Sequence, residues 1–277
     1  MKANDIIGCD VRAYRHLQVG CLALIMVLGS ACSEGQVSTP FLEPTEIVDL
    51  SPTITEDILL RVRGERQLRE AGRKGVTEFE HLVGREPAFI YNAFVEIYDH
   101  GGAHADAPNH IIEGAASIDE VALGGFFGRA RLLDFTDKED DEPISVEDLE
   151  SLEIAAGDII LAYVGYSAPA PGDLPSYPYL SPEAAEYLAT IPIKAFASDM
   201  PSAESFQGVG RLADQGITGA ENLLGAHYAL LSRGIPIIES LVNLESLLGE
   251  ENLVFVGFPL KLEGVSGGPM RAVALVY

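Results

Sequence analysis

The chain has 277 residues, of which 47% are hydrophobic, enough for a sizeable core in one large domain or two small ones. Its formal net charge of −24 argues against nucleic acid as a partner, because phosphates require a basic protein face. The charge favours solubility but says little about the fold.

Residues 1–32 resemble a signal peptide. Basic residues precede the apolar stretch VGCLALIMVLGSAC, which ends in small residues and is too short to span a bilayer comfortably. The alternative is a misassigned start codon, in which case the protein is cytoplasmic. We expect export to the periplasm, with residues 33–45 forming a linker and residues 46–277 the folded domain.

The cysteines bear on both the signal and the fold. They are Cys9, Cys21 and Cys32, so the sequence after residue 32 offers no disulfide within itself, no thiolate ligand and no cysteine nucleophile. The segment LGSAC resembles the cleavage site of a bacterial lipoprotein, which makes Cys32 a candidate lipid anchor. The match is imperfect because Leu28 lies one residue too far from Cys32.

Strands and helices are predicted to alternate only in part along the body, with no internal repeat. Runs of β-branched and aromatic residues predict strands, and serine caps or a terminal glycine mark the helices. The expected strands are 46–54, 89–100, the end of 117–135, 157–167, 192–200, 235–244, 253–264 and 270–277. The expected helices are a short one early in 117–135, then 145–152, 181–190 and 219–234. This order predicts a single α/β domain with a mixed sheet, not a doubly wound one.

Of three further motifs, two are interpreted as loops and the third does not support a nucleophile elbow. The acidic run DKEDDEP at 137–143 lacks apolar periodicity and is interpreted as a solvated loop, with a cation site as the alternative. GVSGG at 264–268 matches the pattern of a nucleophile elbow, but a strand follows where a helix is required. GVGRLA at 208–213 resembles a dinucleotide fingerprint only loosely and follows no strand, so we predict a loop there.

The segment 99–110, DHGGAHADAPNH, carries three of the six histidines of the chain. Its two glycines and its proline argue against a helix. In an extended chain, residues of equal parity share one face, and here the even-numbered positions are His100, His104, Asp106 and His110. Imidazoles with a carboxylate suit Zn²⁺ or Mn²⁺, so the segment predicts a metal site. The alternative is an exposed polar loop in which the histidines cluster by chance.

Two residues far downstream suit the same site. His227 lies in the predicted helix at 219–234, and Glu239 lies in the apolar strand IPIIESL. A buried glutamate is costly unless it is paired or bound to metal, so we interpret Glu239 as a ligand. An exposed strand position is the alternative. Five candidate ligands, two of them carboxylates able to bridge, are enough for one ion or two.

The segment from His100 to His110 resembles the H-x-G-T-H-x-D-x-P-x-H signature of the cyclase family of metal-dependent hydrolases. This family includes bacterial kynurenine formamidase and isatin hydrolase. The resemblance continues through VDLS (48–51), GRARLLDF (128–135), ASDMPSAES (197–205), HYALLSRGIPIIESL (227–241) and GGPMRAVAL (267–275). The signature threonine is Ala103 here, which leaves the ligands in place but removes a hydroxyl near them.

The resemblance implies a swivelling β/β/α fold, a homodimer and one or two Zn²⁺ or Mn²⁺ ions per chain. It implies the metal ligands His100, His104, Asp106, His227 and Glu239, with His110 as the catalytic acid/base. Structural histidine is the alternative role of His110. No organic cofactor is implied.

The implied activity is hydrolysis of an amide by metal-activated water, with N-formylkynurenine as the first substrate candidate. Isatin or another cyclic amide or lactone is the second candidate, and a secreted metal-binding protein without catalysis is the third reading. The loop at 166–179 holds Tyr166, Tyr177 and Tyr179, which either line an aromatic pocket or pack in the core.

Overall fold

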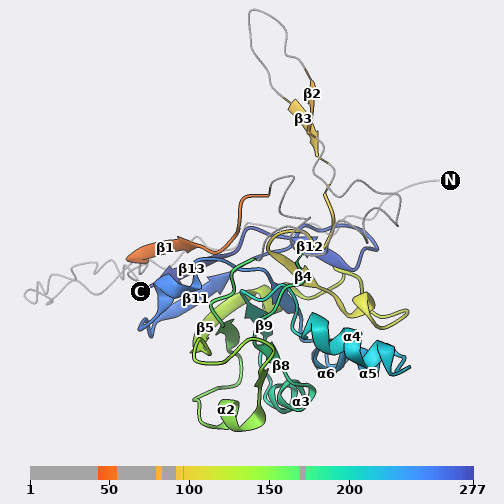
Figure 1. Ribbon diagram of the computed structural model, residues 1–277. Helices are drawn as coiled ribbons and strands as arrows, with labels where there is room; N and C mark the ends of the chain where they lie inside the picture. The colour runs from red at the N-terminus through yellow and green to blue at the C-terminus, as the bar shows by residue number, and fades with distance from the viewer. Residues whose placement is uncertain (1–42, 55–78, 83–91, 96, 169–172) are drawn as a thin grey trace, which may run out of the picture. The chain divides into compact units, whose positions relative to one another are not determined.

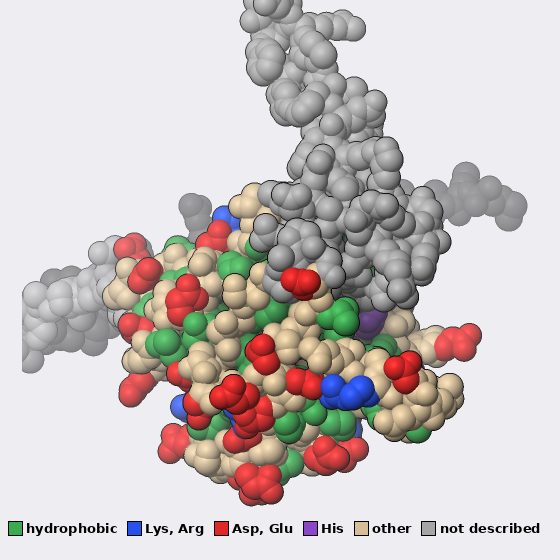
Figure 2. All heavy atoms as spheres, viewed as in Figure 1, with side chains coloured by type: hydrophobic (Ala, Val, Ile, Leu, Met, Phe, Trp, Pro, Cys, Tyr) green, Lys and Arg blue, Asp and Glu red, His purple; other side chains and the backbone are tan. Residues whose placement is uncertain are grey.

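The computed structural model describes residues 43–54, 79–82, 92–95, 97–168 and 173–277 (Figure 1). The predicted signal peptide, most of the predicted linker and part of the predicted strand at 89–100 lie outside these residues. Among the described residues, no helix has both the length and the apolar character needed to cross a membrane. On the face that Figure 2 shows, acidic side chains predominate over basic ones, as the net charge requires.

The domain is built on a nine-stranded mixed sheet in the order β1-β13-β11-β5-β7-β9-β10-β4-β12. Its strands are β1 Glu46–Asp49, β4 His104–Asp106, β5 Phe127–Asp134, β7 Ile159–Tyr163, β9 Ala195–Ser198, β10 Ile237–Glu239, β11 Leu253–Val256, β12 Gly267–Pro269 and β13 Val273–Val276. Strands β5, β7, β9 and β10 are parallel, and antiparallel strands flank them on both sides. The mixed α/β sheet in a single domain is thereby confirmed.

Two small sheets accompany the large one. Strands β2 (Phe79–Leu82) and β3 (Asn92–Val95) form an antiparallel pair. Strands β6 (Pro143–Ile144) and β8 (Tyr179–Leu180) form a short parallel pair beside the acidic loop. The second pair connects that loop to the segment that precedes α3.

The central strands are buried on both faces. Along β7, Ile159 and Leu161 belong to one apolar cluster, whereas Ile160 and Ala162 belong to another. Because both of its faces are covered, a buried parallel strand has a continuous run of apolar residues in its sequence. The first cluster includes residues of the antiparallel flank, such as Phe255, and the second includes residues of the helices. The site described below lies at the β10-β4-β12 end of this sheet.

Two helices begin at the predicted serine caps. The helices are α2 Val146–Glu150, α3 Pro182–Thr190, α4 Phe206–Asp214, α5 Ala220–Leu223 and α6 Gly225–Leu231. Ser145 forms a capping box with Asp148, and Ser181 accepts a hydrogen bond from the backbone of Ala184. The short helix expected early in 117–135 is a 3₁₀ helix, Leu123–Phe126. The helices gather on one side of the sheet (Figure 1).

The loop predicted at 208–213 is wrong, since these residues lie within α4. Gly208 and Gly210 lower its helix propensity, but Ser205 caps it by accepting a hydrogen bond from the backbone of Gly208. Arg211 in the helix also forms an ion pair with Asp141. The glycine pattern alone could not predict the Ser205 cap or the ion pair between Arg211 and Asp141.

The single helix predicted at 219–234 is two helices, because Leu224 has the non-helical angles φ −124° and ψ 56°. A Cβ at Gly225 would lie 2.9 Å from the ring of Pro182, so α6 can approach the start of α3 only with glycine here. The strand predicted at 235–244 ends at Glu239, and Ser240 turns the chain with φ 60°. Glu239 is therefore the last residue of its strand.

Candidate metal centre

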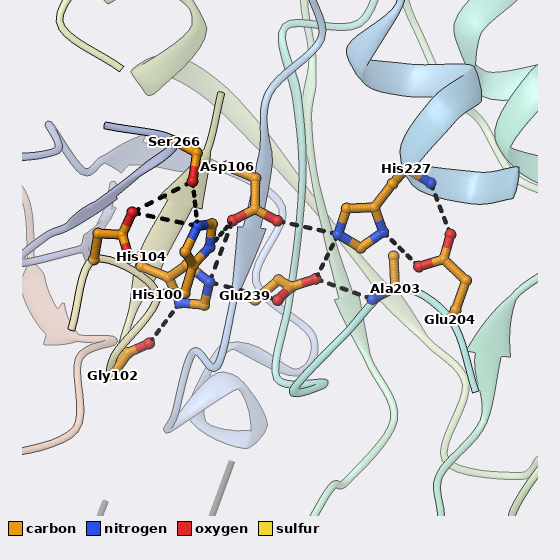
Figure 3. A network of polar contacts seen from close by, with 10 residues as sticks. His100, Gly102, His104, Asp106, Ala203, Glu204, His227, Glu239 and Ser266 are labelled. Carbon is orange, nitrogen blue, oxygen red and sulfur yellow. Dashed lines mark hydrogen bonds and ion pairs between the residues drawn. The ribbon is translucent and has the colours of Figure 1, made fainter. Parts of the chain in front are cut away.

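Strands β4 and β10 place the first three candidate ligands together. His104 and Asp106 project from the same face of β4, as alternation along a strand requires. In the antiparallel register of β4 and β10, Glu239 lies opposite His104. All three side chains are buried, with at most 1% of their surface exposed. Figure 3 shows them converging with His100 and His227, which are described below.

His100 reaches the same place from a turn, because Gly102, with φ 69°, bends the chain before β4. Its Nδ1 lies 2.6 Å from Asp106 Oδ1, and its Nε2 lies 2.9 Å from Ser266 Oγ. A Cβ at Gly267 would lie 2.8 Å from Cε1 of His100. The ring is therefore held between Asp106 and the start of β12.

His104 presents an unpaired nitrogen to the cluster. Its Nδ1 donates a hydrogen bond to the carbonyl of Gly102 at 2.9 Å. In this tautomer the lone pair is on Nε2, which has no hydrogen-bond partner among the described residues. Nε2 lies 3.4 Å from Asp106 Oδ1 and 3.5 Å from Glu239 Oε2. An unpartnered, buried imidazole nitrogen between two carboxylates is the donor set that a divalent cation requires.

His227 closes the cluster from helix α6. Its Nε2 lies 3.0 Å from Asp106 Oδ2 and 3.3 Å from Glu239 Oε1. Asp106 thus contacts His100 with one oxygen and His227 with the other, a geometry suited to a bridging ligand. The backbone N–H of Ala203 donates to Glu239 Oε1 at 3.1 Å and fixes that carboxylate.

His110 lies in a different local structure from the extended chain that was predicted. The chain is extended only over β4, and His110 lies in a 3₁₀ helix, Pro108–His110, that begins at the proline. Its ring centroid lies 4.2 Å from that of His100 and 5.8 Å from that of His227. The six predicted residues are therefore brought together, although equal parity accounts only for His104 and Asp106.

Two sets of three ligand atoms come within binding distance of one another. In each set the atoms lie within 4.8 Å of one another, and Asp106 belongs to both. One set is His104, Asp106 and Glu239, and the other is His100, Asp106 and His110. The geometry thus permits His110 to act as a ligand as well as a proton carrier.

Burial and charge oppose each other at the histidines. Burial lowers the pKa of His227, but the charge of Glu204 and hydrogen bonds with neighbouring carboxylates raise that pKa well above its usual value. Burial also lowers the pKa of His104, and contacts with Asp106 and Glu239 outweigh this effect and raise it. Both imidazoles are thus drawn toward the charged form by buried carboxylates.

Asp106 shows the reverse balance. Burial raises its pKa, but hydrogen bonds with His100 and His227 and the nearby imidazole of His104 lower the pKa well below its usual value. A buried carboxylate needs a positive partner, which protons on the imidazoles or a metal ion can supply. Imidazole binds metal in its neutral form, so a cation bound here would displace those protons. The residues present therefore fit a divalent metal ion.

Two residues at this site were not singled out by the sequence. Glu204, 5% exposed, accepts hydrogen bonds from both the backbone and the Nδ1 of His227. Ser266 contacts His100 and also lies 3.3 Å from Asp99 Oδ2. Glu204 lies within ASDMPSAES and Ser266 within GVSGG, but neither segment shows a spacing that would predict these contacts.

Residues 48–205, which are more than half of the chain, match the model of the putative cyclase family. The chain belongs to this family. A kynurenine formamidase of Bacillus thuringiensis (strain Al Hakam) is 25% identical over 235 residues, which is 84% of this chain and 98% of the relative. Relatives of this protein are thus hydrolases.

Solved structures share the fold. An isatin hydrolase bound to the product analogue thioisatinate superimposes with a TM-score of 0.69 at 21% identity, over 83% of this chain and 92% of that one. A predicted metal-dependent hydrolase from Bacillus stearothermophilus gives a TM-score of 0.59 at 22% identity, over 83% of this chain and 97% of that one. The resemblance expected from the signature is therefore confirmed for the family and for the fold.

Proposed function

We propose that this protein is a metal-dependent amide hydrolase of the arylformamidase type, which converts N-formylkynurenine to kynurenine and formate. The observation that carries the proposal is the buried convergence of His104, Asp106, His227 and Glu239 around an unpartnered imidazole nitrogen. The choice of substrate is supported by the similarity to kynurenine formamidases.

The metal ligands in this proposal are those predicted from the sequence. One or two ions, with Zn²⁺ or Mn²⁺ as the candidates, would be held by His100, His104, Asp106, His227 and Glu239. Asp106 and Glu239 would bridge if two ions bind. A divalent ion in such a site lowers the pKa of water from about 15.7 toward about 7 and polarises a carbonyl oxygen. Asp106 and Glu239, both buried, supply the negative charge that retains the cation.

His110 is the proton carrier in this proposal. It is only partly buried, beside His100, whereas the ligand residues are fully buried. A ring nitrogen of His110 accepts the proton of the attacking water and returns it to the leaving nitrogen of the amide. Such general acid–base catalysis contributes about 10²–10⁴-fold to the rate.

Two tyrosines of the loop at 166–179 have different roles in this proposal. Tyr177 is 2% exposed and donates its hydroxyl hydrogen to the carbonyl of Glu204 at 2.8 Å, so it is a core residue. Tyr166 stacks edge-on against Tyr177 and is only partly buried. Tyr166 is therefore the better candidate for contact with an aromatic substrate.

Hydrolysis of isatin or another cyclic amide is the second candidate function. It is supported by the structural similarity to isatin hydrolase. A lactam and a formamide present the same carbonyl to water, so the two candidates differ only in the leaving nitrogen, which stays attached to the product of a lactam. The shape of the substrate site, and not the metal ligands, would choose between them.

The test is a panel of N-formylkynurenine, simple formanilides, isatin and lactones, assayed on purified protein together with elemental analysis. We expect formamide hydrolysis that is lost with chelator and restored by Zn²⁺ or Mn²⁺. Glu239→Ala should lose metal and activity, whereas the control Glu186→Gln, on an exposed position of α3, should keep both. Activity that persists in metal-free protein would refute the mechanism, and bound metal without activity would favour a non-catalytic metal-binding protein.

Export and assembly complete the proposal. We propose that residues 1–32 direct the protein to the periplasm or to a lipid anchor at Cys32, and that residues 33–45 link this segment to the domain. We further propose a homodimer, the assembly that the family resemblance implies. The hydrophobic N-terminal sequence supports the first proposal.

A further inference from the structure

Glu204 lies outside the predicted ligand set, yet both of its carboxylate oxygens are directed at one ligand residue. Its Oε1 accepts a hydrogen bond from the backbone N–H of His227 at 2.8 Å. Its Oε2 accepts one from Nδ1 of the same residue. Nε2 of His227 meanwhile faces Asp106 and Glu239, so Glu204 lies on the far side of the ring from the other carboxylates (Figure 3).

This contact determines which nitrogen of His227 carries the proton. A neutral imidazole has one N–H donor and one lone pair. A carboxylate only accepts, so the contact with Glu204 requires hydrogen on Nδ1 and leaves the lone pair on Nε2. Only that tautomer presents a donor atom to a cation beside Asp106 and Glu239. His104 has the same arrangement, with the carbonyl of Gly102 in place of a carboxylate.

The position of Glu204 is itself fixed by its neighbours. The hydroxyl of Tyr177 donates to the backbone carbonyl of Glu204 at 2.8 Å. The preceding N–H, of Ala203, donates to Glu239, and the following side chain, of Ser205, contacts Asp141. One short segment, residues 203–205, thus orients two candidate ligands from outside the site.

We propose that Glu204 is a positioning residue that holds His227 in the tautomer able to bind metal and thereby sets the affinity of the centre for divalent ions. The inference rests on the proposed function of the cluster as a metal centre. Glu204 itself touches neither the metal nor the substrate. Its removal acts through His227 alone.

Glu204→Gln is the decisive substitution because it keeps the size of the side chain and removes one acceptor. If the amide oxygen keeps the backbone N–H of His227, the amide NH₂ group faces Nδ1. Nδ1 must then accept, which moves the hydrogen to Nε2 and blocks the ligand atom. We expect the dissociation constant for Zn²⁺ to rise about 10–100-fold, the usual effect of losing such a partner.

The measurement uses the full chain, stripped with chelator and titrated with Zn²⁺ in competition with a chromophoric chelator. Glu186→Gln, the same chemical change on an exposed position of α3, is the matched control and should bind like wild type. Nitrogen-15 spectra of labelled histidine report the tautomer directly. In the zinc-loaded wild type, His227 should carry hydrogen on Nδ1, whereas in Glu204→Gln its Nε2 should carry hydrogen and be free of zinc.

The outcomes separate this inference from the proposed function. Wild type that binds neither Zn²⁺ nor Mn²⁺ would overturn both. Wild type that binds zinc, with Glu204→Gln binding equally well and showing the same tautomer, would overturn the role of Glu204 alone. Should Glu204→Gln fail to fold, Tyr177→Phe removes the hydroxyl that donates to the Glu204 carbonyl, keeps the Glu204 side chain, and decides the matter. We expect weaker zinc binding there too, and unchanged affinity and tautomer would overturn the inference.

Discussion

Asp199 gives the structure a pH dependence that can be worked out in advance. It follows β9, is 6% exposed and accepts hydrogen bonds from the backbone of Val164 at 3.0 Å and of Tyr166 at 2.8 Å. Burial raises its pKa from 3.8 to about 6, although the backbone hydrogen bonds lower it in part. Between these two values the folded state binds more protons than the unfolded state. The free energy of unfolding therefore falls as the pH rises from about 4 through about 6.

The shift of about two pKa units corresponds to about 3 kcal/mol in full. The comparison begins at pH 5, which lies above the ordinary pKa of exposed aspartate and glutamate side chains. Between pH 5 and pH 7.5 the contribution of Asp199 should fall by about 1.5 kcal/mol. Asp199→Asn cannot titrate and should lack this component.

Urea unfolding of chelator-treated wild type and Asp199→Asn, at several pH values, isolates the effect, since all other titrations cancel in the difference. The variant should gain about 1.5 kcal/mol relative to wild type on going from pH 5 to pH 7.5. Asp214→Asn, an exposed carboxylate at the end of α4, is the matched control. A difference between wild type and Asp199→Asn that does not change with pH would refute the reasoning.

The remaining predictions concern the site and the N-terminus. His104→Ala should lose metal and activity together, whereas His110→Ala should keep its metal while kcat falls about 10²–10⁴-fold; metal loss in His110→Ala would make it a ligand. Gly267→Ala should weaken metal binding, because its Cβ would lie 2.8 Å from both Cε1 of His100 and the carbonyl of Asp99; unchanged binding in a correctly folded variant would contradict this. Mass spectrometry of native protein should show that residues 1–31 are absent, and a protein that begins at Met1 would restore the cytoplasmic alternative.

Local patterns in the sequence were sufficient for most elements of the fold. The run IILAY predicted a buried strand because both faces of β7 are covered, and its residues enter both apolar clusters. Ser145 and Ser181 predicted helix starts because a cap needs only a side-chain oxygen and a nearby N–H. The errors at α4 and at Leu224 arise where contacts between distant segments decide the backbone. Propensity alone carries no information about such contacts.

In the candidate site, too, local patterns do not predict the contacts between distant segments. The sequence placed His104 and Asp106 on one face because residues two positions apart in a strand share a face, and the structure agrees. It could not show how His110 reaches the cluster, because the 3₁₀ turn at Pro108 replaces the extended chain. Adding His227 and Glu239 required a chemical argument about buried charge. No local rule relates the histidine segment to His227, which lies 121 positions after Asp106, or to Glu239, which lies still later.

Glu204 shows that residue type alone does not identify the residues that orient the metal ligands. Candidate ligands can be recognised in the sequence as His, Asp and Glu residues that cluster together or lie in an apolar segment. The residues that orient them need only one acceptor oxygen at the right position. For His104 that oxygen is a backbone carbonyl, which belongs to no particular side chain, and for His227 it is a glutamate 23 residues earlier. The tautomer of a ligand histidine is thus decided by the fold around it. A sequence motif can therefore predict which residues bind the metal, whereas the affinity of the centre depends on contacts that only the folded chain creates.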